Sequence, residues 1–260
     1  MITGFAAGVP YVALEPADPS RPAPMIAVWH LMDPPCTEQA MAAAVPMAGL
    51  PAWRVYFGLP MTGRRALPGG PEEFFRLASE DAVMNAYRPQ TEQGADEFPK
   101  ALAELRTQLS IADGPVGIAG GSSGSMVAYE VAARAEVPIF AAAFVSPVTQ
   151  LVPLVAANER RYGVTFPWND ENRAVANHYD YVRRAAEIKV PALLVVGEHD
   201  DIAIREPAEL LHKESDAELV TIPGMRHELA DAPGTEAAPQ TEDARRVDAE
   251  LIRFFQRHLG

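Results

Sequence analysis

A serine flanked by glycines is the feature of this sequence that most clearly indicates chemistry. Residues 120–124 read Gly-Gly-Ser-Ser-Gly, which fits the pattern G-x-S-x-G. An apolar run, 115–119, precedes this pattern, and residues 125–134 have the composition of a helix. A sharp turn between a strand and a helix would hold Ser122 in a strained backbone conformation, and glycines two positions to either side would prevent a clash. Ser122 is therefore the candidate nucleophile, and the alternative is an ordinary strand-to-helix turn.

A serine nucleophile needs a base, and the base needs an acid that orients it. The apolar run 190–196 predicts a strand buried on both faces, and the carboxylate Asp200 follows in the next loop. A shorter strand is expected over 218–222, with His227 in the loop after it. The carboxyl ends of parallel strands gather catalytic groups at one edge of a sheet. The sequence therefore offers Asp200 as the acid and His227 as the base.

These three motifs together resemble the α/β-hydrolase superfamily. They are the G-x-S-x-G turn at Ser122, the G-E-x-D stretch that ends at Asp200, and the P-G-x-x-H stretch that ends at His227. The resemblance extends over nearly the whole chain and implies an α/β fold, with a mostly parallel central sheet flanked by helices. It also implies a catalytic triad in this chain order, in which Asp200 orients His227 and His227 takes the proton of Ser122.

The resemblance further implies an oxyanion hole made of two backbone N–H groups. One belongs to Ser123, directly after the nucleophile, and the other to Met32, in the loop after the expected strand 24–30. The sequence departs from the family here, because Leu31 stands where the family commonly has glycine, and leucine restricts the backbone. A second departure is Gly58, at a position where the family usually has aspartate.

The segment 148–189 lies between two expected core strands and is longer than an ordinary connection. We interpret it as a small cap inserted in a single α/β-hydrolase domain that spans residues 1–260. Such a cap would place Phe166 and Trp168 in a substrate pocket, together with Leu31. The alternative is a crossover helix whose aromatic side chains simply bury themselves.

Periodicity and turn residues predict the remaining elements. A helix is expected over residues 37–49 with a kink at Pro46, and another over residues 96–109. Asp201 is expected to cap the helix that follows it rather than to serve as the acid. The acidic, proline-rich segment 231–243 is expected to be a mobile loop.

Composition limits the classes of function. The net charge of −13 over 260 residues argues against nucleic acid and against anionic membrane surfaces. The sequence shows neither an apolar run long enough to span a membrane nor a signal-peptide pattern at its start. One cysteine, Cys36, excludes an internal disulfide and suits a reducing cytoplasm. The histidines lack metal-ligand spacing and no nucleotide-binding motif is present, so neither a metal nor a cofactor is expected.

The sequence therefore predicts a cytoplasmic serine hydrolase that cleaves a carboxylic ester or related acyl bond of a small molecule through an acyl-enzyme on Ser122. A thioesterase, a small-peptide hydrolase and a cofactor-free perhydrolase remain alternatives, since all would use the same triad and the fold cannot choose among them. A non-catalytic binding protein on a hydrolase scaffold is an alternative of another class. The complete set of serine, aspartate and histidine argues against it. The oligomeric state stays open.

Overall fold

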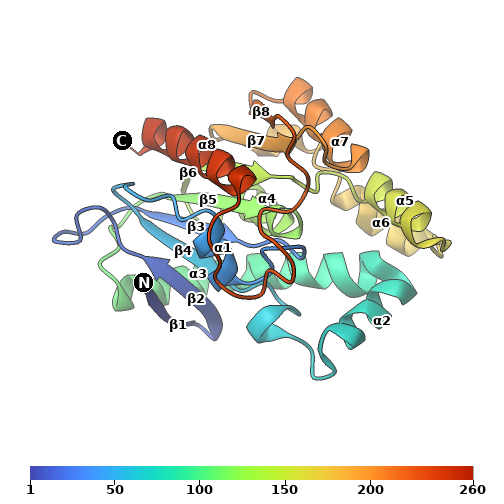
Figure 1. The fold of residues 1–260 in the computed structure, drawn as a ribbon, viewed down its shortest axis with the longest axis horizontal. Helices are drawn as coiled ribbons and strands as arrows, with labels where there is room; N and C mark the ends of the chain where they lie inside the picture. Colours follow the sequence, from blue (N-terminus) through green and yellow to red (C-terminus); the bar gives the residue numbers. More distant parts are fainter. Residues whose placement is uncertain (260) are drawn as a thin grey trace.

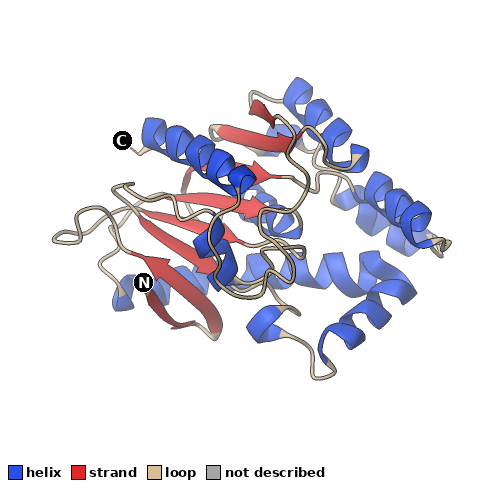
Figure 2. Cartoon of the chain, viewed as in Figure 1, coloured by secondary structure: helices blue, strands red, loops and turns tan. Residues whose placement is uncertain are grey.

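The apolar runs of the sequence form the strands of one sheet in this computed structural model, which describes residues 1–259. The sheet has eight strands in the order β1-β2-β4-β3-β5-β6-β7-β8. Its strands are β1 (Ile2–Ala6), β2 (Val9–Leu14), β3 (Met25–Trp29), β4 (Trp53–Phe57), β5 (Val116–Gly121), β6 (Ile139–Val145), β7 (Ala192–Gly197) and β8 (Glu218–Ile222). Strand β2 is antiparallel to both of its neighbours, and all other pairs are parallel. The α/β fold with a mostly parallel sheet is thus confirmed (Figure 2).

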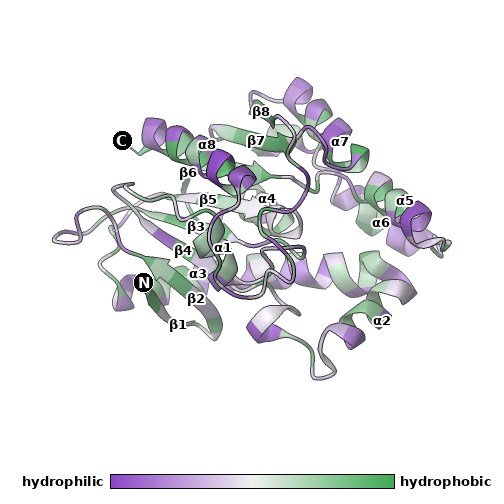
Figure 3. Cartoon of the chain, viewed as in Figure 1, coloured by the Kyte–Doolittle hydropathy of each residue, from purple (hydrophilic) through white to green (hydrophobic). Residues whose placement is uncertain are grey.

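Helices cover both faces of this sheet (Figure 1). They are α1 (Glu38–Ala44), η1 (Gly63–Arg65), α2 (Gly70–Ala82), η2 (Val83–Tyr87), α3 (Arg88–Gln108), α4 (Ser123–Arg134), α5 (Leu151–Tyr162), α6 (Asp170–His178), η3 (Ala185–Glu187), α7 (Ile202–Glu214) and α8 (Glu242–His258). Helices α1 and α8 pack on one face, and α3 and α4 pack on the other. Green and purple alternate along α7 and α8 in Figure 3, and apolar residues such as Leu211 and Leu251 are among the buried residues of these helices. Over residues 1–259, no helix has the length and apolar character needed to cross a membrane.

The central strands are buried because both of their faces are covered. Every residue of β3, β5 and β7 is buried, as expected for parallel strands between two helical layers. The parallel register aligns Trp29 with Gly120 and Gly197 with Ile222, so the loops after these strands open on the same side of the sheet. A side chain at Gly124 would collide with the carbonyl groups of Trp29 and His30. Glycine at this position therefore lets the start of α4 approach the end of β3.

Two excursions leave the sheet on the side where the central strands end (Figure 1). The first, residues 70–87, holds α2 and η2, and the second, residues 148–189, holds α5, α6 and η3. They contact each other, since the side-chain amide of Asn172 donates to the carboxylate of Asp81 at 3.0 Å. The second excursion thus contains two α-helices rather than one crossover helix. The first was not anticipated as helical.

Two helix predictions need correction at their ends. The helix expected over residues 37–49 ends at Ala44, because proline at position 46 disfavours the helical conformation of Val45 before it. Its start is as predicted, since the hydroxyl of Thr37 accepts the N–H of Ala40 at 3.1 Å. The helix expected over residues 96–109 begins earlier, at Arg88.

The segment 231–243 was expected to be mobile, but backbone contacts hold it against the loop around residue 36. The carbonyl of Gly234 accepts the N–H of Cys36 at 2.9 Å, and the carbonyl of Thr235 accepts the hydroxyl of Thr37 at 2.8 Å. Gly234 has a positive φ of 65°, and a side chain there would collide with Pro34. The composition of the segment could not predict these hydrogen bonds, because each partner lies far away in the sequence.

Candidate active site

Ser122 occupies the turn between β5 and α4. Its φ of 47° and ψ of −120° lie in a region that non-glycine residues rarely adopt. Its N–H donates to the carbonyl of Val145 at 3.0 Å, which ties the turn to the end of β6. A side chain at Gly120 would collide with the carbonyl of Gly124. The two glycines of the motif therefore permit a turn that places the Ser122 hydroxyl at the end of the strand.

Three side chains from separate loops form one hydrogen-bonded row. His227 follows β8, and its Nδ1–H lies 2.9 Å from Oδ1 of Asp200, which follows β7. Its Nε2 lies 3.0 Å from Oγ of Ser122. The carboxylate at Nδ1 favours the tautomer that carries its proton there, so Nε2 can accept the serine proton. The side chain of Asp200 is completely buried, whereas that of His227 keeps 20% of its surface exposed.

The neighbouring carboxylates have other partners. Asp201 accepts the N–H of Ala203 at 2.9 Å and caps α7, as predicted. Glu198 accepts the N–H of Gly224 at 2.8 Å and so connects the loops after β7 and β8. Asp200 itself is held by the N–H of Asp201, which donates to Oδ1 at 2.7 Å. Of these three acids, Asp200 is the one in contact with the imidazole.

The surroundings of His227 make it a stronger base. Burial alone would lower the pKa of this imidazole. The hydrogen bond and charge of Asp200, with the charges of Asp33 and Glu228, outweigh burial and raise the pKa above its usual value. These carboxylates therefore favour the imidazolium that would form when His227 takes a proton.

The two predicted oxyanion donors belong to the start of α4 and to the loop after β3. Ser123 is the first residue of α4, so its N–H has no partner within the helix and carries the positive end of the helix dipole. Met32, in the loop after β3, is partly buried against the hydrophobic core. His30 braces this loop, since its Nδ1–H donates to the carbonyl of Leu31 at 2.6 Å and its Nε2 accepts the N–H of Leu59 at 3.0 Å. Burial lowers the pKa of His30 to about 4, so the imidazole is neutral.

The three residues expected to line a substrate pocket all pack in or against the hydrophobic cores. Leu31 is completely buried and fills the space that a side chain at Gly121 would occupy. The prediction that Leu31 lines a pocket is therefore corrected, because its side chain is enclosed by the core on that face of the sheet and has no exposed surface. Phe166 and Trp168 follow α5, contact each other edge to face at 4.6 Å and pack on the hydrophobic core. Their role in a pocket stays a prediction.

Asp33 and Tyr87 lie near His227 and were not predicted from the sequence. Oδ2 of Asp33 lies 3.6 Å from Nε2 of His227, and 52% of the Asp33 side chain is exposed. Tyr87, the last residue of η2, is buried close enough to Asp33 for that charge to affect its pKa. The available signal for Asp33 was its position directly after the expected oxyanion loop. Within residues 1–259, no group of three or more His, Cys, Asp or Glu side chains is arranged to hold a metal ion.

Comparison with known proteins shows which family the chain belongs to. The sequence profile of the prolyl oligopeptidase family matches residues 82–260, which is more than half of the chain. The chain belongs to the prolyl oligopeptidase family. Together with the fold, this membership makes it a serine hydrolase of the α/β-hydrolase superfamily. No curated protein sequence matches the chain.

Solved structures share the fold of this prolyl oligopeptidase family member at low sequence identity. TT1662 from Thermus thermophilus has a TM-score of 0.66 and 17% identity, over 100% of this chain and 99% of that one. An esterase domain from a Rhodothermus marinus protein has a TM-score of 0.60 and 16% identity, over 100% and 98%. A puromycin-hydrolyzing peptidase of Mycobacterium tuberculosis has a TM-score of 0.66 and 17% identity, but 97% of this chain covers only 37% of that protein.

Proposed function

We propose that this protein hydrolyses the acyl bond of a small ester or a short peptide through an acyl-enzyme on Ser122. The observation that carries the proposal is the continuous hydrogen-bonded row from Ser122 through His227 to Asp200. A non-catalytic binding protein would have no need for this row or for the strained turn that presents the serine. Serine, a neutral imidazole and a buried carboxylate are the parts required for nucleophilic acyl transfer.

In the proposed mechanism, Oγ of Ser122 attacks the substrate carbonyl carbon while Nε2 of His227 takes the hydroxyl proton. The buried carboxylate of Asp200 holds the imidazole in position and stabilises its positive charge. The N–H groups of Ser123 and Met32 donate to the oxyanion of the tetrahedral intermediate. The intermediate then breaks the bond to the leaving group, which receives the proton from His227.

Water completes the proposed cycle. His227 is neutral again after the leaving group has departed, so it can take a proton from a water molecule that attacks the acyl-enzyme. The second intermediate collapses, the acid product leaves, and the proton returns from His227 to Ser122. No step requires a group beyond the chain, the substrate and water.

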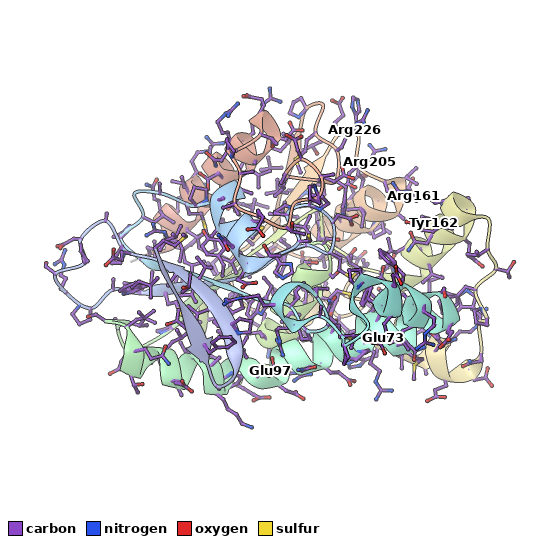
Figure 4. The ribbon with its side chains drawn as sticks, turned by 60° about the horizontal axis from the view of Figure 1, so that its bottom comes forward. Glu73, Glu97, Arg161, Tyr162, Arg205 and Arg226 are labelled. Atoms are coloured by element: carbon purple, nitrogen blue, oxygen red, sulfur yellow. The ribbon has the colours of Figure 1, made fainter. Side chains whose placement is uncertain are left out.

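The substrate is proposed to be small and polar rather than a long hydrocarbon acyl compound. Charged residues of both signs are neighbours of His227, since Asp33 lies 3.6 Å from its Nε2 and Arg226 directly precedes it in the chain. Arg205 of α7 donates to the backbone carbonyl of Asp200 at 3.1 Å. Figure 4 shows Arg226, Arg205, Arg161 and Tyr162 in the same part of that view of the molecule. Charged groups of both signs suit a short peptide or an aminoacyl ester, and six of the similar structures are described as peptidases or aminopeptidases.

We further propose that residues 148–189 form a cap on a single hydrolase domain, together with residues 70–87. The contact between Asn172 and Asp81 supports a shared unit. Asn158 and Tyr162 of α5 lie close to Tyr87 at the end of η2. The two excursions thus meet near Asp33, at the side of the candidate site where a substrate would enter.

Covalent labelling separates catalysis from binding. A fluorophosphonate should attach to Ser122, as located by peptide mass mapping, and Ser122→Ala should prevent the attachment. A panel of p-nitrophenyl esters and amino-acid p-nitroanilides then measures the preference for ester or peptide bonds. Failure of the wild-type protein to react with the fluorophosphonate would reject the proposed function in favour of a binding protein.

A further inference from the structure

Asp33 has a position that the proposed mechanism does not use. Its Oδ2 lies 3.6 Å from Nε2 of His227, and that nitrogen is 3.0 Å from Oγ of Ser122. The carboxylate therefore lies within about two hydrogen-bond lengths of the nucleophile. The acid position of the triad is already filled, since Asp200 contacts the other imidazole nitrogen.

The charge of Asp33 lies beside the nitrogen of His227 that would take the serine proton. Half of its side chain is exposed, and within residues 1–259 its one ion pair is with His227. It directly follows Met32, the proposed donor to the oxyanion. A carboxylate here opposes the negative charge that develops on the carbonyl oxygen, although the imidazolium formed at His227 offsets part of that charge. A cation supplied by the substrate would remove this opposition.

Tyr87 lies near Asp33, and the side chains close to Tyr87 suit a cationic group. Burial raises the pKa of Tyr87 to about 12, the charges of Asp33 and Tyr162 add to the rise, and the side chain of Asn158 opposes it. The phenol of Tyr87 therefore stays neutral and protonated at physiological pH. Tyr162 is largely exposed at the end of α5 (Figure 4). A carboxylate beside aromatic rings and neutral polar groups is a favourable environment for an ammonium ion.

We propose that Asp33 binds the free α-ammonium group of the acyl part of the substrate, so that the enzyme prefers aminoacyl esters and short peptides with an unblocked amino terminus. This inference rests on the proposed function. In an α-aminoacyl substrate, the ammonium nitrogen is two bonds from the carbonyl carbon, which Ser122 must approach to about 3–3.5 Å. The ammonium group is then within reach of a carboxylate at the distance of Asp33. The ion pair would also cancel the adverse charge beside the oxyanion.

The test compares leucine p-nitroanilide with N-acetyl-leucine p-nitroanilide, which lacks the positive charge. The wild-type enzyme should prefer the free amine by about 10- to 100-fold in kcat/KM. Asp33→Asn should remove this preference, chiefly by lowering kcat/KM for the free amine. Because both substrates are measured on the same enzyme at the same pH, their ratio is independent of the protonation state of His227. The exposed position of Asp33 makes an unchanged melting temperature the expected result for the variant.

Glu228→Gln is the matched control. Glu228 is exposed, and its charge also raises the pKa of His227, but the carboxylate in contact with Nε2 is that of Asp33. The control should change kcat/KM for both substrates equally and leave their ratio within about twofold.

Three outcomes would overturn the inference. A wild-type preference for the acetylated substrate would show that the site does not bind an ammonium group. An equal loss on both substrates in Asp33→Asn would show that Asp33 acts through His227 instead. Turnover of neither substrate would also reject it, and the fluorophosphonate reaction of Ser122 would then show whether the proposed hydrolase function survives.

Discussion

At the residue scale, the proposed chemistry depends on side chains that are held in place by hydrogen bonds and backbone geometry. Ser122 is held by its strained backbone and by the bond from its N–H to Val145. His227 is held between Asp200 and Ser122, and Asp200 by the N–H of Asp201. Each group of the proposed triad therefore has its reactive atom positioned before a substrate binds, which reduces the reorganisation needed for reaction.

Ser122→Ala should abolish turnover and leave the fold intact. Removal of the nucleophile is expected to lower kcat by about 10⁴- to 10⁶-fold, because triad members act as a unit. Initial rates on the best p-nitrophenyl ester, with a circular dichroism spectrum as the fold check, measure this. Ser123→Ala is the control, since its buried hydroxyl has no hydrogen-bond partner and only its backbone N–H has a proposed role. Residual activity of Ser122→Ala above about a tenth would exclude Ser122 as the nucleophile.

We expect Asp200→Asn to lower the rate of catalysis and Asp201→Ala to lower the stability of the fold. Asparagine at position 200 keeps the shape but favours the wrong tautomer of His227, so kcat should fall by up to about 10⁴-fold with little change in melting temperature. Alanine at position 201 removes the cap of α7, so about 1 kcal/mol of stability should be lost with little change in kcat. Kinetics and thermal denaturation of both variants give the comparison. A larger rate loss at position 201 would mean that the acid is wrongly assigned.

Activity should fall in acid as His227 becomes protonated, since only the neutral imidazole accepts the serine proton. Burial lowers the pKa of His227, but the carboxylates of Asp200, Asp33 and Glu228 raise it by more than burial lowers it. The acid limb of kcat/KM should therefore lie above the usual histidine pKa of about 6.5. Asp33→Asn removes one of these charges and should move the limb to lower pH. The profile is best measured on an acetylated substrate that has no titrating amine. A rate independent of pH down to about 4 would argue against a histidine base.

At the scale of elements, the turn at Ser122 depends on α4 and on the loop that leads into α5. Gly124 allows α4 to approach the end of β3. The buried hydroxyl of Ser125 donates to the carbonyl of Ser122 at 2.5 Å and accepts the N–H of Val148 at 3.0 Å. One side chain on the first turn of α4 thus fastens the proposed nucleophile turn to the base of the second excursion.

Ser125→Ala should therefore destabilise the protein without removing its chemistry. The N–H of Val148 would lose its partner in a buried position, which costs about 1–3 kcal/mol. We expect kcat to fall by less than about tenfold, because the contact between Ser122 and His227 is unaltered. Urea denaturation and steady-state kinetics measure the two effects, and Ser123→Ala again serves as the control. Unchanged stability would show that the hydroxyl is not needed to fasten the turn.

At the scale of the whole molecule, the excursions share their apolar core with the sheet. Val155 of α5 and Phe166 after it belong to the same cluster of buried side chains as Trp29 and Trp53 of the sheet. Trp168 packs against that cluster. Because the proposed cap shares its apolar core with the rest of the domain, we expect both to unfold together.

The protein should consequently unfold in a single cooperative transition. Tryptophan fluorescence, far-ultraviolet circular dichroism and loss of hydrolase activity should give coincident thermal midpoints. Trp168→Phe leaves Trp29 and Trp53 as reporters of the sheet, and its fluorescence midpoint should match the circular dichroism midpoint of the same variant. An earlier fluorescence transition in the wild-type protein that Trp168→Phe removes would show that the cap melts independently.

Local patterns in the sequence determined much of the fold and the identity of the main site residues. The strand expected over residues 218–222 has those bounds in the structure, and the apolar run 190–196 corresponds to β7, whose residues are all buried. Ser122, Asp200 and His227 could be named in advance because each follows a predicted strand, and the parallel register brings their loops together.

Other features were decided only by the tertiary structure. Asp33 and Tyr87 lie near His227, Leu31 turns into the core, and the segment 231–243 is anchored on the loop around residue 36. Each of these depends on contacts between residues that are distant in the sequence, where periodicity carries no information. A hydrophobic pattern records which side of an element is buried. The packing of the helices and strands decides which loops are neighbours. It therefore also decides which charged side chains lie near the proposed nucleophile.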